Sequence, residues 1–479
     1  MADKSNRQEQ PADQHDHQVT IDQSSSNTIK TQDDLCLRMT TSETPGPSTD
    51  TSWDAYRILL ATVLSNALLL GVSLSFGVFQ DYYTNTLKFS DRSSWIGVLN
   101  AGIPFLGAPL MTRLSHSTRF PLQYYIFAGW ACCIVALLGS AFCHTLGSLV
   151  VTQGLLYGLG VLLSEMPTFV IFNTWFVRRR GLVYGIVFGS TDLFGVASSF
   201  AASTMLSKHG MKATFLMFAA ICFVITGIAI CFLKRRPSTN YSPSATVVSE
   251  DTATGSSIQS QPLRYYLRPS FYLFMAANLL QSLAFYLPFI YLASYTTMLD
   301  SLTSRGAGAI VLAVANAAQI VGELTFGALS DKVNVHILVA LSSLLACLST
   351  FFLWGFADSF GLLIAFALAF GGTASGFLAL WPRIGTLFGE SDASMIYSFM
   401  SCGRGLGAIV SGPISTALIP DRRADQPALS AQDKFRHVIL FVGVCMAISS
   451  AVGFTCLFAS LWKNKRKLCM KLDCRCCIA

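Results

Sequence analysis

The sequence predicts an all-α membrane protein with twelve transmembrane helices arranged in two pseudo-symmetric halves of six. Of its 479 residues, 52% are hydrophobic and only 12% are charged, about half the charged fraction of a typical soluble domain. Twelve apolar segments each approach the roughly 20 residues that a helix needs to cross a bilayer. A longer polar stretch between the sixth and seventh segments divides them into two equal sets.

The spans follow the apolar runs, and the polar stretches give the other divisions of the chain. Residues 1–52 are rich in Gln, Asp, Ser and Thr, so we expect a disordered cytoplasmic tail. The N-terminal half then covers 53–233, a cytoplasmic linker 234–269, the C-terminal half 270–462 and a basic, Cys-rich cytoplasmic tail 463–479. The spans are expected at 56–80, 94–112, 122–143, 147–174, 181–206, 213–233, 271–296, 306–329, 336–356, 360–381, 394–419 and 437–462.

Three consecutive arginines, Arg178, Arg179 and Arg180, fix the orientation. Arginine is costly in hydrocarbon, so the triplet is expected in water or at the headgroups, and a basic cluster in a short loop marks the cytoplasmic side. With both tails inside, the inward loops and tail carry about twice as many Lys and Arg as the outward loops.

The span after this triplet carries glycines Gly181, Gly185 and Gly189, each four residues apart. They share one helix face, which lets a neighbouring backbone approach closely. We therefore predict tight packing of this helix on a partner.

The composition also excludes several classes of protein. The net charge of +7 comes from residues in loops beside apolar spans, so it indicates topology rather than nucleic-acid binding. No GxxxxGK[ST] motif and no metal-spaced His/Cys cluster lies in the spans, so we predict neither an enzyme, a cofactor nor a metal. No apolar signal segment begins the chain.

The tail cysteines Cys469, Cys474, Cys476 and Cys477 favour acylation beside an anionic lipid surface over a zinc site.

Four ionisable residues stand out within the predicted spans: Glu165, Asp192, Glu323 and Arg404. Such groups usually face the bundle interior or a water-filled cavity and mark transport pathways. Burial favours the protonated form of an acid, which suits proton uptake and release, while Arg404 can hold a carboxylate or phenolate. The alternatives are an ion pair of Arg404 with Glu323 and a helix-packing hydrogen bond of Asp192.

Neutral polar residues at mid-helix extend this set. Asn316, Gln319 and Glu323 share one helix face and form the best candidate substrate surface. The alternative for such residues is hydrogen bonding between helices. Tyr286, beside Pro288, could stack on an aromatic ligand or act as a core anchor. The pathway candidates are completed by Asn66 and Gln281.

A weak internal repeat supports the two halves. Residues 327–336 read G-A-L-S-D-K-V-N-V-H, and 108–116 read A-P-L-M-T-R-L-S-H. Both resemble the G-x-L-x-D-R/K loop of the major facilitator superfamily, whose charge contacts latch the cytoplasmic side. The resemblance implies that role for Asp331 and Lys332, together with the arginine triplet, whereas Thr112 replaces the Asp of the N-terminal copy.

The chain also resembles the fungal branch of the monocarboxylate-transporter-like family. The similar pieces are S-F-G-V-F-Q-D-Y-Y (75–83), W-F-V-R-R-R-G-L-V-Y-G (175–185), F-Y-L-P-F-I-Y-L (285–292) and G-L-G-A-I-V-S-G-P-I (405–414). The resemblance implies a twelve-helix, two-domain alternating-access carrier that often moves a carboxylate with a proton, and we expect a monomer. The animal branch has a Lys near position 74, here Leu74, and an Asp-x-x-x-Arg pair where this chain has Gln319 and Glu323, so the animal mechanism does not transfer.

Two main functions follow as expectations. The first is secondary active, proton-coupled transport of a small organic molecule, above all a carboxylate or related organic acid, across the plasma membrane or a vacuolar or other internal membrane. The alternative is efflux of a fungal secondary metabolite. A non-transporting nutrient sensor ranks last, because the tails are short and polar.

Overall fold

The structure is a computed structural model that describes residues 50, 52–88, 94–117, 120–235, 265–299, 307–389, 392–419 and 430–476. Every regular element in these ranges is helical. Most of the expected N-terminal tail and the expected linker lie outside the described residues, as do the side chains of the expected C-terminal tail. The extents of these segments therefore stay predictions.

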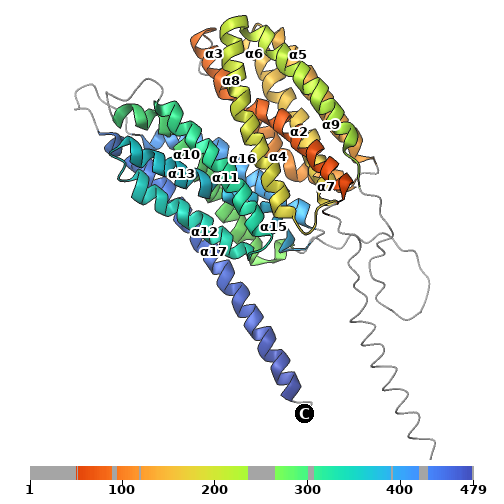
Figure 1. The fold of residues 1–479 in the computed structure, drawn as a ribbon, viewed down its shortest axis with the longest axis vertical. Coiled ribbons are helices and arrows are strands. Elements are labelled where there is room, and N and C mark those ends of the chain that lie inside the picture. The colour runs from red at the N-terminus through yellow and green to blue at the C-terminus, as the bar shows by residue number, and fades with distance from the viewer. Residues whose placement is uncertain are drawn as a thin grey trace, which may run out of the picture. The chain divides into compact units, whose positions relative to one another are not determined.

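The N-terminal half contains the helices coloured red to yellow-green in Figure 1. The first span breaks at Ser75, whose backbone N–H still bonds to the carbonyl oxygens of Gly71 and Val72. Short π-helical segments interrupt the fourth and sixth spans, at 150–156 and 222–226. The helices are α2 (Trp53–Leu74), α3 (Phe76–Asn85), α4 (Ser94–Ser117), α5 (Leu122–Ala141), α6 (Leu146–Leu149), α7 (Tyr157–Asn173), α8 (Arg180–Ile221) and α9 (Gly227–Phe232).

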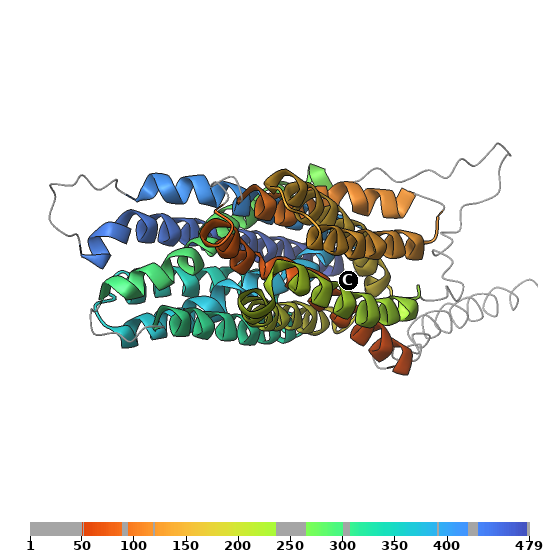
Figure 2. The same ribbon diagram turned by 90° about the horizontal axis from the view of Figure 1, so that it is seen from above.

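The C-terminal half contains the green to blue helices, and Figure 2 shows the two groups from above. Its fourth span is broken into three helices at 375 and 380. Its last helix runs past the predicted end of the span to Cys476. The helices are α10 (Pro269–Leu299), α11 (Ala307–Ser330), α12 (Val335–Leu348), α13 (Phe360–Ala374), α14 (Gly376–Ala379), α15 (Trp381–Thr386), α16 (Ala393–Leu418) and α17 (Ala431–Cys476).

Ten helical stretches in the described ranges are long and apolar enough to cross a membrane. One of them, Arg180–Phe232, has 53 residues and would be about 80 Å long if straight, far more than the roughly 30 Å of hydrocarbon. It is broken at Gly210, whose φ of 78° is a conformation that glycine adopts readily. The two parts on either side of this break correspond to the predicted spans 181–206 and 213–233. The 26-residue α16 is not among the ten, and the count of twelve stays a prediction.

The two halves meet along two helix pairs, α8 with α11 and α4 with α16. The predicted glycine face of α8 makes the first pair close. A Cβ on Gly181 would stand 2.4 Å from the carbonyl oxygen of Gly327, and a Cβ on Gly185 2.6 Å from that of Glu323. No side chain fits at such distances, so the expectation of tight packing is confirmed.

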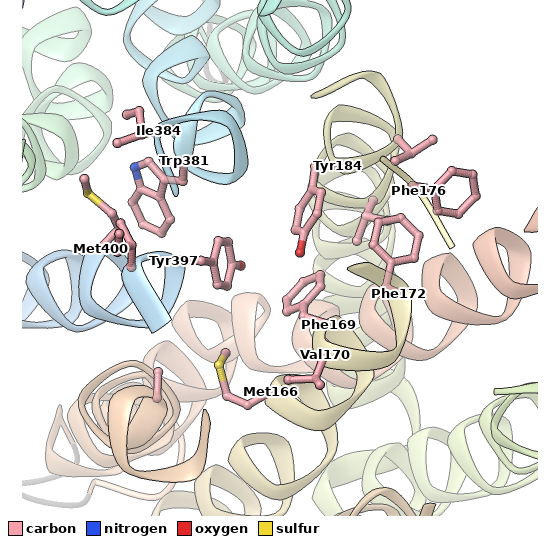
Figure 3. Packing of buried hydrophobic residues seen from close by; sticks show 14 of the residues in the cluster. Met166, Phe169, Val170, Phe172, Phe176, Tyr184, Trp381, Ile384, Tyr397 and Met400 are labelled. Carbon is pink, nitrogen blue, oxygen red and sulfur yellow. The ribbon is translucent and has the colours of Figure 1, made fainter. Parts of the chain in front are cut away.

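An aromatic cluster joins the halves beside these helices (Figure 3). The rings of Phe169 on α7, Tyr184 on α8 and Tyr397 on α16 point toward one another, with centroids 5.2 to 5.7 Å apart. Trp381 on α15 packs on Tyr397 at 6.0 Å. Because α7 and α8 belong to the N-terminal half and α15 and α16 to the C-terminal half, the cluster packs the two halves together on the side of the arginine triplet.

Candidate substrate and proton pathway

Polar side chains from three helices converge where the halves meet. Asp192 comes from α8, Gln319 and Glu323 from α11, and Arg404 from α16. The Gln319 amide donates a hydrogen bond to Asp192 Oδ2, and Arg404 and Asp192 both act electrostatically on Glu323. Because Glu323 is fully buried and Arg404 is only 6% exposed, water screens these charges little. Three of the four ionisable candidates thus form one cluster.

The guanidinium of Arg404 is enclosed by aromatic rings. Its central carbon lies 4.5 Å from the ring centroid of Phe285, 5.2 Å from that of Tyr286 and 6.0 Å from that of Trp381. Cation–π attraction favours this placement. Within the described residues, Arg404 Nη1 has no hydrogen-bond partner. A buried, planar donor group with aromatic walls suits a carboxylate or phenolate carried on an apolar body.

Glu165 lies in a different place, on α7 of the N-terminal half. It is 7% exposed, and its Oε2 has no hydrogen-bond partner among the residues that the structure describes. Beside it is a small cavity with room for about one water molecule. The polar residues lining this cavity are Ser65, Asn66, Ser164 and Thr168. Glu165 is therefore a second, separate acidic position.

The neutral candidates are buried or half-buried, and two of them make packing hydrogen bonds. Gln281 is buried and donates to the Ala374 carbonyl oxygen at 2.8 Å, which ties α10 to the end of α13. Asn66 donates to the Thr62 carbonyl oxygen of its own helix. Asn316 is half-buried on the same helix as Gln319. Only Gln319 reaches the charged cluster through a hydrogen bond described here.

Asp331 caps the start of α8 from the opposite half. Its two carboxylate oxygens accept the backbone N–H groups of Gly181 and Leu182, at 2.8 and 2.9 Å. Arg383 Nε lies 3.8 Å from the same carboxylate. A carboxylate at a helix N-terminus is stabilised by the free N–H groups and the helix dipole. Lys332 is exposed, so the geometry favours Asp331 over Lys332 as the latch.

The arginine triplet does not behave as a unit. Arg178 and Arg179 are exposed, as expected for headgroup or water contact. Arg180 is 4% exposed and donates to the carbonyl oxygens of Phe176 and Asn173. Backbone carbonyls replace water around this third guanidinium, which explains why it tolerates burial.

Several residues that make structural contacts were not predicted. Tyr184 and Tyr397 fill the aromatic cluster, and Tyr184 lies in the quoted 175–185 motif, so its position was the available signal. Asn278 ties α10 to α16 by donating to the Met400 carbonyl oxygen at 2.8 Å. Asp50 accepts the backbone N–H groups of 177–179 at 2.6 to 3.2 Å. The polar residues that flank Asp50 in the sequence did not indicate this contact.

A family model described as Major Facilitator Superfamily matches residues 61–303, half of the chain. The chain belongs to the major facilitator superfamily. Members of this superfamily are transporters, and the all-helical structure is consistent with its fold. The predicted membership is therefore confirmed, and this major facilitator protein is a multi-pass membrane transporter.

The relatives of this major facilitator protein come from two groups. The MFS-type transporter pynF of Aspergillus niger is 26% identical over 384 residues, 78% of this chain and 84% of pynF. The agnestins efflux protein AgnL12 of Paecilomyces divaricatus is 26% identical over 69% of this chain and 73% of its own length. Monocarboxylate transporter 10 of Mus musculus is 23% identical over 79% and 75%. These similarities agree with the predicted fungal, monocarboxylate-transporter-like branch.

Proposed function

We propose that this major facilitator protein is a proton-coupled carrier of a small organic acid, which it holds through Arg404. The observation that carries the proposal is the buried guanidinium among Phe285, Tyr286 and Trp381, with Nη1 unpartnered in the described part of the chain. An arginine binds a carboxylate through two parallel hydrogen bonds. Asp192 and Glu323, one from each half, lie beside Arg404. An anion bound to Arg404 would therefore link substrate occupancy to the protonation of these two acids.

The aromatic walls narrow the proposed substrate class. Rings around a guanidinium favour an acid that carries an aromatic or flat apolar body over a short polar one. The positions where the animal branch has an Asp and an Arg are here Gln319 and Glu323, so the anion-binding charge lies on α16 instead of α11. We propose the plasma membrane as the site of action and the monomer as the working unit.

Binding to the purified chain tests this proposal. The panel pairs aromatic and aliphatic carboxylates with their uncharged amides. Arg404→Gln should weaken carboxylate binding about tenfold or more, the loss expected for a charged hydrogen bond, and leave amide binding unchanged. Arg57→Ala is the matched control, because Arg57 also lies over a ring, that of Phe232 at 5.1 Å, but on an exposed surface. Equal carboxylate affinity in wild type and Arg404→Gln would overturn the assignment.

A second candidate is efflux of a fungal secondary metabolite. The name of AgnL12 describes it as an efflux protein for agnestins, and this supports export as the direction of transport. The two candidates share the site but differ in direction. Vesicles loaded with a binding acid and placed in opposite pH gradients separate them, because export in exchange for protons and import with protons respond to the gradient with opposite signs.

A further inference from the structure

Two carboxyl groups face each other across the interface between the halves. Asp192 belongs to the N-terminal half and Glu323 to the C-terminal half, and the two side chains lie within hydrogen-bonding reach. An ionised carboxylate only accepts hydrogen bonds. In the described residues neither oxygen of Glu323, which is fully buried, has a hydrogen-bond partner of good geometry, and the nearby Gln319 amide already donates to Asp192. A proton on one of the two acids would supply the missing donor.

The local charge balance leads to the same conclusion. Arg404, from α16, acts on both acids, and the Gln319 amide that donates to Asp192 is neutral. Farther out, Tyr397 interacts electrostatically with both Arg404 and the second acid, Glu165. One guanidinium balances one carboxylate. Two like charges this close, buried from water, do not both ionise readily, so the pair titrates as one system.

We propose that Asp192 and Glu323 share one proton, and that this proton holds α8 against α11. The pair lies on the same helix pair as Gly185, where the two backbones approach closely, and Asp331 caps the start of α8 at the end of that interface. Loss of the proton would leave two negative charges facing each other across the halves. Protonation is then linked to the separation of α8 from α11, which deepens the proposed function by giving proton coupling a location.

The test follows the thermal unfolding of the full chain in detergent as a function of pH, without substrate. Wild type is compared with Asp192→Asn, Glu323→Gln and the double variant. Above about pH 5 an exposed acid in the unfolded chain has released its proton, whereas the folded pair retains one under this proposal, so stability should fall as pH rises. The expected fall in Tm is on the order of one to two degrees per pH unit.

The decisive outcome is whether the losses of pH dependence in the two single variants add up to the loss in the double variant. In either single variant the remaining acid pairs with Arg404 and ionises, so each single variant should lose as much of the pH dependence as the double variant. If the two single losses instead add up to the double loss, the acids titrate independently and the proposal is wrong. Glu165→Gln is the control, because its effect should add to that of Glu323→Gln.

Infrared spectroscopy gives a second readout, which compares wild type with the single variants Asp192→Asn and Glu323→Gln. Wild type at neutral pH should show the carbonyl stretch of a protonated carboxyl group, and this band should weaken in either single amide variant. A band of unchanged strength in both variants would overturn the shared proton. Because neither measurement uses a substrate, this inference can fail while the proposed transport function stands, and the reverse also holds.

Discussion

Two single residues have distinct roles in the proposed mechanism: Arg404 binds the substrate, and Asp331 joins the halves at the start of α8. Arg404 is buried among three rings, and Asp331 satisfies two backbone N–H groups of the opposite half. Each places a charge where few polar groups are available, so each should have a large effect when removed. The exposed Lys332, directly after Asp331, makes no contact of this kind in the described residues.

Removing the carboxylate of Asp331 should destabilise the contact between the end of α11 and the start of α8. Asp331→Ala leaves the N–H groups of Gly181 and Leu182 without their acceptor, and the loss of a helix cap costs about 1 to 2 kcal/mol in free energy of unfolding. Thermal unfolding of the purified chain measures this loss. Lys332→Ala is the control and should change stability little. Equal stability of the two variants would show that Asp331 is not a latch.

The sequence predicted the ionisable residues of the site and offered an Arg404–Glu323 pair and a helix-packing hydrogen bond of Asp192 as alternatives, but it did not identify the residue that bonds to Asp192. Glu165, Asp192, Glu323 and Arg404 stand out because charge in an apolar span is rare. The contact of Asp192 with Gln319 joins residues 127 positions apart on two halves, and no spacing rule connects them. Arg180 was expected at the surface, and its burial depends on carbonyl groups that only the folded loop supplies.

At the scale of the helices, the pairing of α8 with α11 determines how closely the halves meet. The four-residue spacing of Gly181, Gly185 and Gly189 predicted a packing face, and the structure identifies α11 as its partner. The sequence could not name that partner, because a small-residue face fits any helix that approaches it. The break at Gly210, in contrast, was predictable, because this glycine lies in the short polar stretch between the predicted spans 181–206 and 213–233.

A single methyl group at this contact should disturb the closed arrangement. In Gly185→Ala the new Cβ would lie 2.6 Å from the Glu323 carbonyl oxygen, so α8 and α11 must move apart. We expect a loss of about 1 to 3 kcal/mol in the free energy of unfolding, measured by thermal unfolding in detergent.

Gly361→Ala supplies the control for that substitution. Gly361 lies in the first turn of α13 with no heavy atom within 4 Å of its Cβ position. This change should be neutral or slightly stabilising, because alanine suits a helix better than glycine. If Gly185→Ala is as stable as Gly361→Ala, the two backbones do not pack as closely as described.

At the scale of the whole molecule, the proposed carrier combines a substrate-binding charge, a pair of acids and a latch along one interface. Arg404 lies on α16, the acids lie on α8 and α11, and Asp331 reaches the start of α8. The two-half organisation was predictable because twelve apolar runs with a central polar stretch leave few alternatives. The closed aromatic cluster was not, because Phe169, Tyr184 and Tyr397 resemble ordinary core residues in sequence.

The most direct measurement is the flux of a binding acid into proteoliposomes with and without an imposed pH gradient. Wild type should move the acid faster with the gradient than without it, Arg404→Gln should lose transport, and Glu323→Gln should keep transport but lose its response to the gradient. Arg57→Ala should match wild type. Transport by wild type that ignores the gradient, or full transport by Arg404→Gln, would contradict proton-coupled carriage of an organic acid through Arg404.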